Sequence, residues 1–180
     1  MANASPSPLT RDVLLPRLAN HVLEHGLAGA SLRPLAKAAG TSDRMLIYHF
    51  GSKDGLVEAL LGHIAATYRT ALDAMVPPVP APSRRALARQ MLDLARAPMF
   101  APFLKLWWEI VAGAAKGEGA WRRSAAAMMD SQIAWFAAHM PPHDPDPQGG
   151  ARAVAMAVEG ALMLDAIGLG DVAEAGLATL

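Results

Sequence analysis

The sequence contains no cysteine, so disulfide bonds, thiolate metal ligands and a cysteine nucleophile are all excluded. Its opening residues, MANASPSPLT, carry neither a basic cluster nor an apolar run, which is unlike a secretory signal peptide. The most apolar stretch, residues 153–164, is short and contains Glu159, which argues against a membrane span. We therefore expect a cytoplasmic protein that makes no use of a membrane.

Sequence motifs that mark common classes of enzyme are also missing. The patterns HExxH, GxSxG, GxGxxG and the Walker phosphate loop do not occur, and the six histidines show no metal-ligand spacing. Asp144 and Asp146 fall in a proline-rich loop, which we expect to be flexible and not catalytic. The sequence thus predicts neither an enzyme nor a bound metal or cofactor.

What the chain does contain favours helices. Hydrophobic residues make up 53% of its 180 positions, which is enough for a core, and strong helix formers outnumber β-branched residues. Apolar positions recur with helical spacing between glycine and proline breaks, and no strand pattern is found. We predict an all-α fold of about nine helices, at residues 10–25, 31–39, 42–50, 53–75, 83–97, 98–113, 120–139, 151–167 and from 171 onward.

Charge is distributed unevenly along the chain, although the formal net charge is zero. Up to Lys53 there are six lysines and arginines against three acids, whereas the remainder has ten against thirteen. A basic N-terminal segment attached to an acidic body is typical of a small DNA-binding head.

Residues 31–50 form the most informative segment. Two short helices joined by a tight turn at Gly40 have the layout of a helix-turn-helix. Leu46 and Phe50 are placed to anchor the second helix on the first, which leaves its other positions near the surface. Such a helix can enter the major groove of DNA, with its N-terminal residues at the base edges.

Individual side chains of this segment suit particular DNA contacts. Arg44 can bind guanine O6 and N7, or it is a solvated arginine. Met45 either contacts a thymine methyl group or packs inside, and His49 either pairs with phosphate or folds back on the head. For Arg33 we expect a solvated side chain first and a phosphate contact second. The remaining candidates suit phosphate oxygens: Thr41, Ser42, Tyr48 and Lys53.

Residues 10–62 resemble the DNA-binding domain of the tetracycline-repressor (TetR) family. The match rests on the spacing of Gly26, Ser31, Ala36, Ala39-Gly40, Ser42 and Leu46, and above all on the run Tyr48-His49-Phe50-Gly51-Ser52-Lys53-Asp54. Two departures are Ile47, where the family often has a phosphate-contacting aromatic residue, and Met45, where it favours a small one.

The resemblance implies a homodimeric regulator, usually a repressor, that leaves a palindromic double-stranded operator when a small apolar or amphipathic effector binds. It implies three parts: a flexible arm at residues 1–9, a DNA-binding domain at residues 10–53, and a helical ligand-binding and dimerisation domain at residues 54–180. The alternative is a helical dimer that binds a ligand or a protein but no longer recognises DNA. Ile47 and the zero net charge keep this alternative open.

Two further groups of residues are expected in the C-terminal part. Aromatic and methionine side chains are core by default, but the resemblance makes some of them candidates for lining a ligand pocket: Phe100, Phe103, Leu104, Trp107, Trp108, Met128 and Trp135. Residues 151–167 are apolar on most sides, so a partner subunit is expected to cover one face; the alternative is a helix at the centre of the protein's own core. The dimer candidates are Val154, Ala157, Val158, Ala161 and Leu162.

Overall fold

The computed structural model describes residues 10–27 and 31–180, and within these ranges it contains nine α-helices, one short 3₁₀ helix and no strand. The prediction of an all-α fold with about nine helices is confirmed; the arm predicted at residues 1–9 lies outside the described residues. The helices are α1 (Arg11–His25), α2 (Leu32–Ala39), α3 (Asp43–Phe50), α4 (Lys53–Met75), α5 (Arg84–Arg96), η1 (Pro98–Phe100), α6 (Ala101–Ala115), α7 (Gly119–Ala138), α8 (Pro147–Ala166) and α9 (Gly170–Leu177).

The chain forms two compact units, which do not coincide with the predicted functional domains. One unit consists of Met1–Arg69 with Lys105–Ala125, and the other of Thr70–Leu104 with Ala126–Leu180. Helices α4, α6 and α7 each contribute residues to both units. The predicted boundary after Lys53 thus falls just behind the first residue of α4 and does not separate the compact units, and the functional division at that point stays a prediction.

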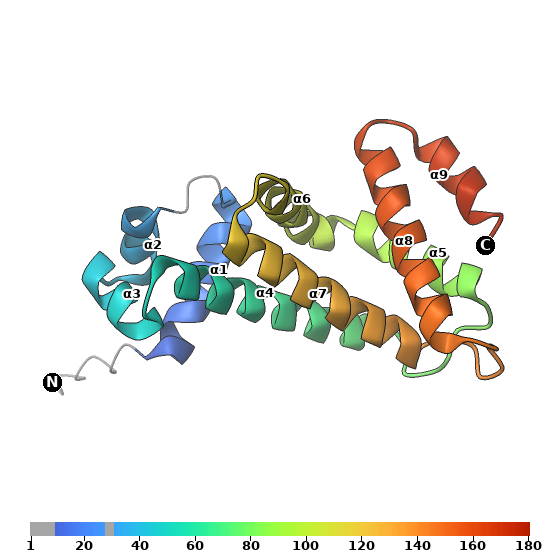
Figure 1. Cartoon of the computed structure of the whole chain (residues 1–180), viewed down its shortest axis with the longest axis horizontal. Coiled ribbons are helices and arrows are strands. Elements are labelled where there is room, and N and C mark those ends of the chain that lie inside the picture. The colour runs from blue at the N-terminus through green and yellow to red at the C-terminus, as the bar shows by residue number, and fades with distance from the viewer. Residues whose placement is uncertain (1–9, 28–30) are drawn as a thin grey trace, which may run out of the picture. The chain divides into compact units, whose positions relative to one another are not determined.

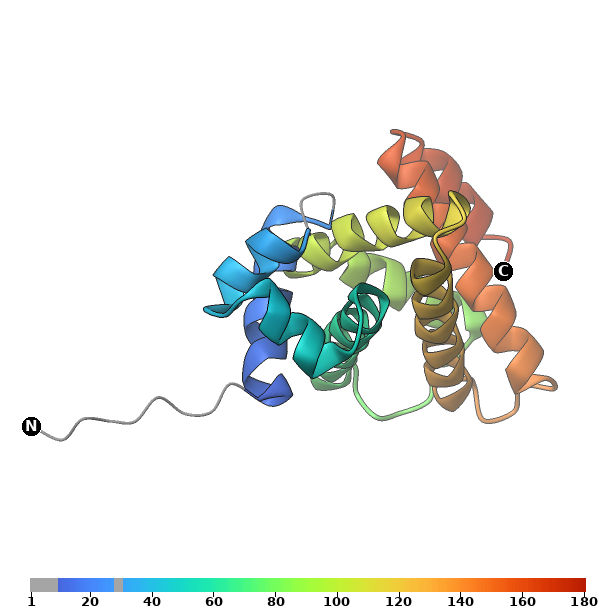
Figure 2. The same cartoon turned by 60° about the vertical axis from the view of Figure 1, so that its left-hand side comes forward.

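In the first unit, α1, α2 and α3 form a three-helix head, which both views show (Figures 1 and 2). The apolar positions of α1 lie one turn apart, and Leu14, Leu18 and Val22 are all buried. Leu35 and Ala39 are buried on α2, and Leu46 and Phe50 on α3. Because α2 and α3 have only eight residues each, too few for an isolated helix to be stable in water, this shared core is what keeps them helical.

The turn between α2 and α3 depends on Gly40, which adopts a left-handed conformation with φ 70°. The Gly40 N–H donates to the carbonyl of Lys37 at 3.1 Å, and the Thr41 N–H donates to that of Ala36 at 2.9 Å. This pair of hydrogen bonds is a Schellman motif, in which glycine avoids the steric penalty that a side chain would meet.

In the second unit, α8 packs against α5 and α9, and α8 and α9 form a helical hairpin (Figure 1). Arg96 on α5 joins both partners: its guanidinium donates to Asp165 of α8 at 2.8 Å and to Glu174 of α9 at 2.6 Å. These hydrogen bonds hold the pKa of both carboxyl groups below its usual value. Arg89 makes a further ion pair with Glu174.

The loop before α8 is anchored, whereas the sequence predicted a flexible segment. Arg84 donates from Nε and Nη2 to the two carboxylate oxygens of Asp144, at 2.7 and 2.6 Å. Asp146 then caps α8, since its Oδ1 accepts from the Gly149 N–H at 2.8 Å. The hydrogen bonds from Arg84 lower the pKa of the Asp144 carboxyl group to about 2.

We predict that Asp144→Asn lowers the melting temperature at neutral pH and that this difference disappears in acid. The folded-state pKa of Asp144 is depressed from 3.8 to about 2, so its contribution is complete above pH 4 and is lost as the pH falls through about 2. Differential scanning calorimetry between pH 7 and pH 2 measures the difference. Asp130→Asn, at an exposed position of α7, is the control. A difference that stays constant down to pH 2 would contradict a role for the ionised carboxylate.

Candidate nucleic-acid interface

The N-terminal end of α3 is fixed by a side-chain cap. The Ser42 Oγ accepts from the Met45 N–H at 3.3 Å, and Asp43 places a negative charge in the first turn. Both features satisfy or compensate the free N–H groups at the start of the helix. At the same time Leu46 and Phe50, which are 0% and 5% exposed, face the core.

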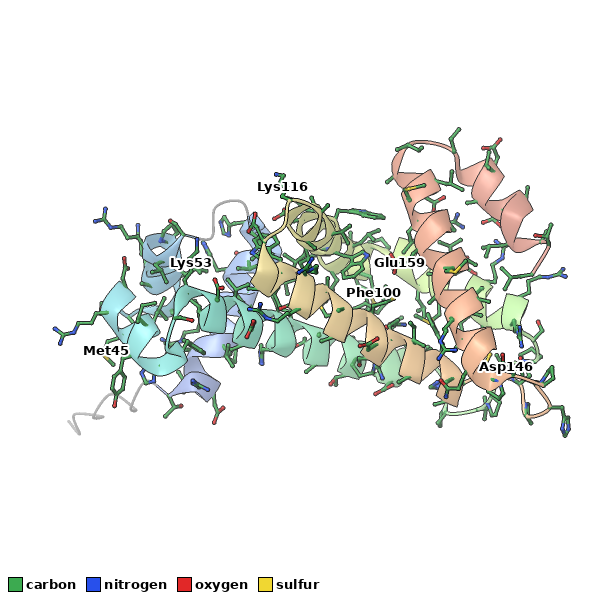
Figure 3. The ribbon with its side chains drawn as sticks, in the orientation of Figure 1. Met45, Lys53, Phe100, Lys116, Asp146 and Glu159 are labelled. Atoms are coloured by element: carbon green, nitrogen blue, oxygen red, sulfur yellow. The ribbon has the colours of Figure 1, made fainter. Side chains whose placement is uncertain are left out.

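With those positions buried, the outer face of α3 carries Arg44, Met45 and Tyr48. All three are exposed, Met45 by 37% and Tyr48 by 77% (Figure 3 labels Met45). At this exposure the Tyr48 ring contributes little to the core and is accessible to another molecule. The first two residues lie in the first turn and a half of α3, which is the part that approaches base edges in helix-turn-helix complexes.

The other predicted contacts lie around this face. Lys53 is exposed at the first position of α4, and Arg33 is exposed in the first turn of α2. Thr41 is half-buried in the turn between α2 and α3, next to the exposed Ser42. The cap uses Ser42 as an acceptor, which leaves its hydroxyl hydrogen free to be donated to a phosphate oxygen.

His49 and Ile47 are less accessible than the three exposed side chains of α3 described above. The Nε2 atom of His49 is buried with no hydrogen-bond partner, and its ring meets that of Tyr48 edge-on, at 5.3 Å between centroids. The Nε2 atom of His49 is thus turned toward the head in this structure, and a phosphate contact of His49 stays a prediction. Ile47 is half-buried, so Tyr48 is the exposed aromatic residue of α3.

Two arginines of α1 also belong to this region, although the sequence identified them only as charges. The Arg11 Nε donates to the carbonyl of His49 at 2.6 Å, and the Arg17 Nη1 donates to the carbonyl of Ala39 at 3.0 Å. No spacing rule could have found these contacts, because the acceptors are main-chain atoms 38 and 22 residues away.

The predicted ligand-contacting residues divide into two groups. Phe100 and Trp135 are 2% and 4% exposed, and the Trp135 Nε1 donates to Asp73 at 2.8 Å while its ring stacks on His139. These two side chains are core in this structure. The others are partly exposed on α6 and α7, so they stay candidates: Phe103, Leu104, Trp107, Trp108 and Met128.

The predicted dimer residues of α8 are mostly buried within their own unit. Val154, Val158, Ala161 and Leu162 pack in the core that α8 shares with α5 and α9, and Ala157 is half-buried. The exposed apolar side chains of α8 are instead Met156 and Met163, at 77% and 52%. They lie seven residues apart on one face, which continues to Ile167 at 66%.

Metal and membrane sites were searched among the described residues. No group of three or more histidine, aspartate or glutamate side chains is placed to hold a metal ion there. None of the helices that the structure describes combines the length and apolar character that a membrane crossing needs.

Comparison with known proteins gives a consistent result for the head. Residues 19–60 match the family described as "Bacterial regulatory proteins, tetR family". The chain is 28% identical over 109 residues to the HTH-type transcriptional regulator BetI of Ectopseudomonas mendocina, covering 59% of this chain and 56% of BetI. It is 32% identical over 68 residues to the HTH-type transcriptional repressor NicS of Pseudomonas putida, covering 38% of this chain and 32% of NicS. The matches thus span about half the length of the first relative and a third of the second.

Among solved structures, the fold match extends over nearly the whole chain. A TetR-family transcriptional regulator from a Rhodococcus species superposes with a TM-score of 0.65 and 25% sequence identity. The superposition covers 94% of this chain and 95% of that one. The likeness in fold therefore extends beyond residues 19–60, which match the family.

Proposed function

We propose that this chain, whose residues 19–60 match the tetR family of bacterial regulatory proteins, is a ligand-responsive transcriptional repressor that binds a palindromic operator as a homodimer. The observation that carries the proposal is the outer face of α3. A capped two-turn helix with Arg44, Met45 and Tyr48 exposed on a buried base of Leu46 and Phe50 is suited to enter a major groove.

Within the interface, Arg44 is proposed to recognise a base and Lys53 a phosphate. A guanidinium in the first turn of the recognition helix can donate two hydrogen bonds to one guanine. Lys53 lies at the start of α4, just beyond the end of α3, where a phosphate strand bordering the groove would run.

The two variants Arg44→Ala and Lys53→Ala should therefore differ in kind. Arg44→Ala is expected to lose about 1–3 kcal/mol of discrimination at one G·C pair in each half-site. Lys53→Ala should weaken binding to all sequences alike and lower the salt slope by about one. Fluorescence anisotropy on a panel of single-base operator variants, taken from the DNA upstream of the protein's own gene, measures both.

A uniform loss across the panel for Arg44→Ala would remove base recognition from this residue. If the wild-type protein binds none of its upstream DNA, the result favours the alternative, which is a helical dimer that binds a ligand or a protein without recognising DNA.

For the homodimer, we propose that the partner subunit covers the exposed face of α8. Met156 and Met163 lie on that face with Gly160 between them, which allows a second helix to approach closely. The loop to α9 and α9 itself also expose apolar side chains, since Leu169 and Val172 are 42% and 48% exposed. An apolar surface of this kind is rarely left in contact with water.

Introducing negative charge on this face of α8 should prevent the two subunits from associating. We expect Met156→Glu combined with Met163→Glu to be monomeric at micromolar concentration, because two carboxylates would have to be buried without partners. Met99→Glu, at a position 56% exposed in η1, is the matched control and should remain dimeric. Analytical ultracentrifugation decides between the states. A wild-type protein that sediments as a monomer would rule out the dimer altogether.

For the effector response, we propose that α6 connects ligand binding with the head. The carboxylate of Glu109 on α6 accepts a hydrogen bond of 2.5 Å from the Leu27 N–H, just beyond the end of α1. The approach is close enough that a Cβ at Gly26 would lie 2.5 Å from the same carboxylate. The candidate ligand contacts Trp107 and Trp108 lie on the same helix, within a turn of Glu109. If α6 can adopt two placements and an effector binds one of them more tightly, the effector favours that placement. The contact between Glu109 and Leu27 would then pass the change on to the head.

This contact can be tested without knowing the effector. Glu109→Ala should speed hydrogen–deuterium exchange of the Leu27 amide and change operator affinity, although Glu109 is not part of the DNA-facing surface. Glu109→Gln retains an acceptor oxygen and should stay close to wild type. Unchanged operator affinity in Glu109→Ala would separate α6 from DNA recognition.

A further inference from the structure

Both helices of the helix-turn-helix end on an arginine from α1. Arg17 donates to Ala39, the last residue of α2, and Arg11 donates to His49, in the last turn of α3. We propose that Arg11 and Arg17 are positioning residues: they fix the orientation of α2 and α3 by capping their C-terminal ends, and they do not neutralise DNA phosphates. The inference rests on the proposed DNA binding for its effect on affinity, but the capping itself can be measured without DNA.

The chemistry of a helix end explains why a guanidinium binds there. The last carbonyl groups of an α-helix have no N–H partner within the helix, and together they carry a partial negative charge. In α2 the Schellman hydrogen bonds use the carbonyls of Ala36 and Lys37. Arg17 supplies a donor to the carbonyl of Ala39, and its Nη1 lies 3.4 Å from where a Cβ at Gly40 would stand. A Cβ at position 40 would therefore lie in van der Waals contact with this guanidinium.

Arg11 holds α3 by two contacts. Besides its hydrogen bond to the carbonyl of His49, its guanidinium carbon lies 5.2 Å from the centroid of the Phe50 ring. A cation over an aromatic face at this distance is attracted to it. Phe50 is the buried anchor at the C-terminal end of α3, while Ser42 caps the opposite end. Arg11 thus fixes the end of the helix that the serine cap does not reach.

The two arginine contacts reduce the number of cations in the head that we expect to contact DNA phosphates. Six cations stand between residues 10 and 53, but Arg11 and Arg17 are engaged with main-chain carbonyls. Arg11 and Arg17 are exposed as well, but the proposal leaves the phosphate contacts to the other four exposed cations: Arg33, Lys37, Arg44 and Lys53. Because each phosphate contact contributes about one unit to the salt dependence of binding, positioning and phosphate contact predict different salt slopes.

The experiment compares Arg11→Gln, Arg17→Gln and Arg11→Lys with Lys53→Ala as the phosphate-contact control. We expect each glutamine variant to bind the operator about two- to fivefold more weakly, the size of a lost charge at a helix end, with an unchanged salt slope. Arg11→Lys keeps the charge but loses the planar donor, so its affinity should fall as well. Without DNA, amides of residues 48–51 should exchange faster in both Arg11 variants, and amides of residues 38–41 in Arg17→Gln.

Other outcomes overturn the proposal in recognisable ways. A salt slope that falls by about one in Arg11→Gln, with wild-type exchange and full affinity in Arg11→Lys, would make Arg11 a phosphate contact. If a glutamine variant does not reach the helix content of the wild type, Arg11→Lys decides: weaker binding with faster exchange supports capping, and wild-type values of both refute it. Failure of the wild type to bind DNA would end the proposed function, whereas the exchange measurement would still confirm or refute the capping.

Discussion

The free carbonyl and N–H groups at the ends of short helices are the constraint on which the head depends. A helix of eight residues has as many end groups without partners as one of twenty, but far fewer internal hydrogen bonds to set against them. In α2 and α3 these end groups form hydrogen bonds within the glycine turn, with the serine cap and with the two arginines of α1. The outer face of α3 is free to contact another molecule because its stability is supplied from elsewhere.

Local patterns were sufficient to predict this head because they act at short range. The position of Gly40, the cap at Ser42 and the buried pair Leu46 and Phe50 each follow from the neighbouring few residues, and the structure has all of them. The contacts of Arg11 and Arg17 could not be foreseen, since a main-chain acceptor leaves no trace in the identity of the residue that provides it. The burial of His49 Nε2 was undecided in the sequence for a related reason: either orientation is compatible with helical spacing.

The C-terminal part shows what composition leaves undecided. Residues 151–167 are apolar on most sides, which favoured Val154, Val158, Ala161 and Leu162 as dimer contacts. Helices α5 and α9 cover those residues within the same unit. Periodicity identifies an apolar face but not which neighbour covers it, because that depends on how distant helices pack. Trp135 illustrates the same point, since a ring that looked available to a ligand is stacked on His139 and bonded to Asp73.

The two α1 arginines hold main-chain oxygens, and every type of amino acid has such an oxygen. The identity of the side chains on the outward face of α3 is therefore irrelevant to the end contacts. Substitutions at Arg44, Met45 and Tyr48 can accumulate without loosening the frame that presents them. In evolutionary terms, the framework and the recognition surface are separable: one can be retained while the other diversifies, and α3 offers a small set of positions at which a new sequence preference could arise.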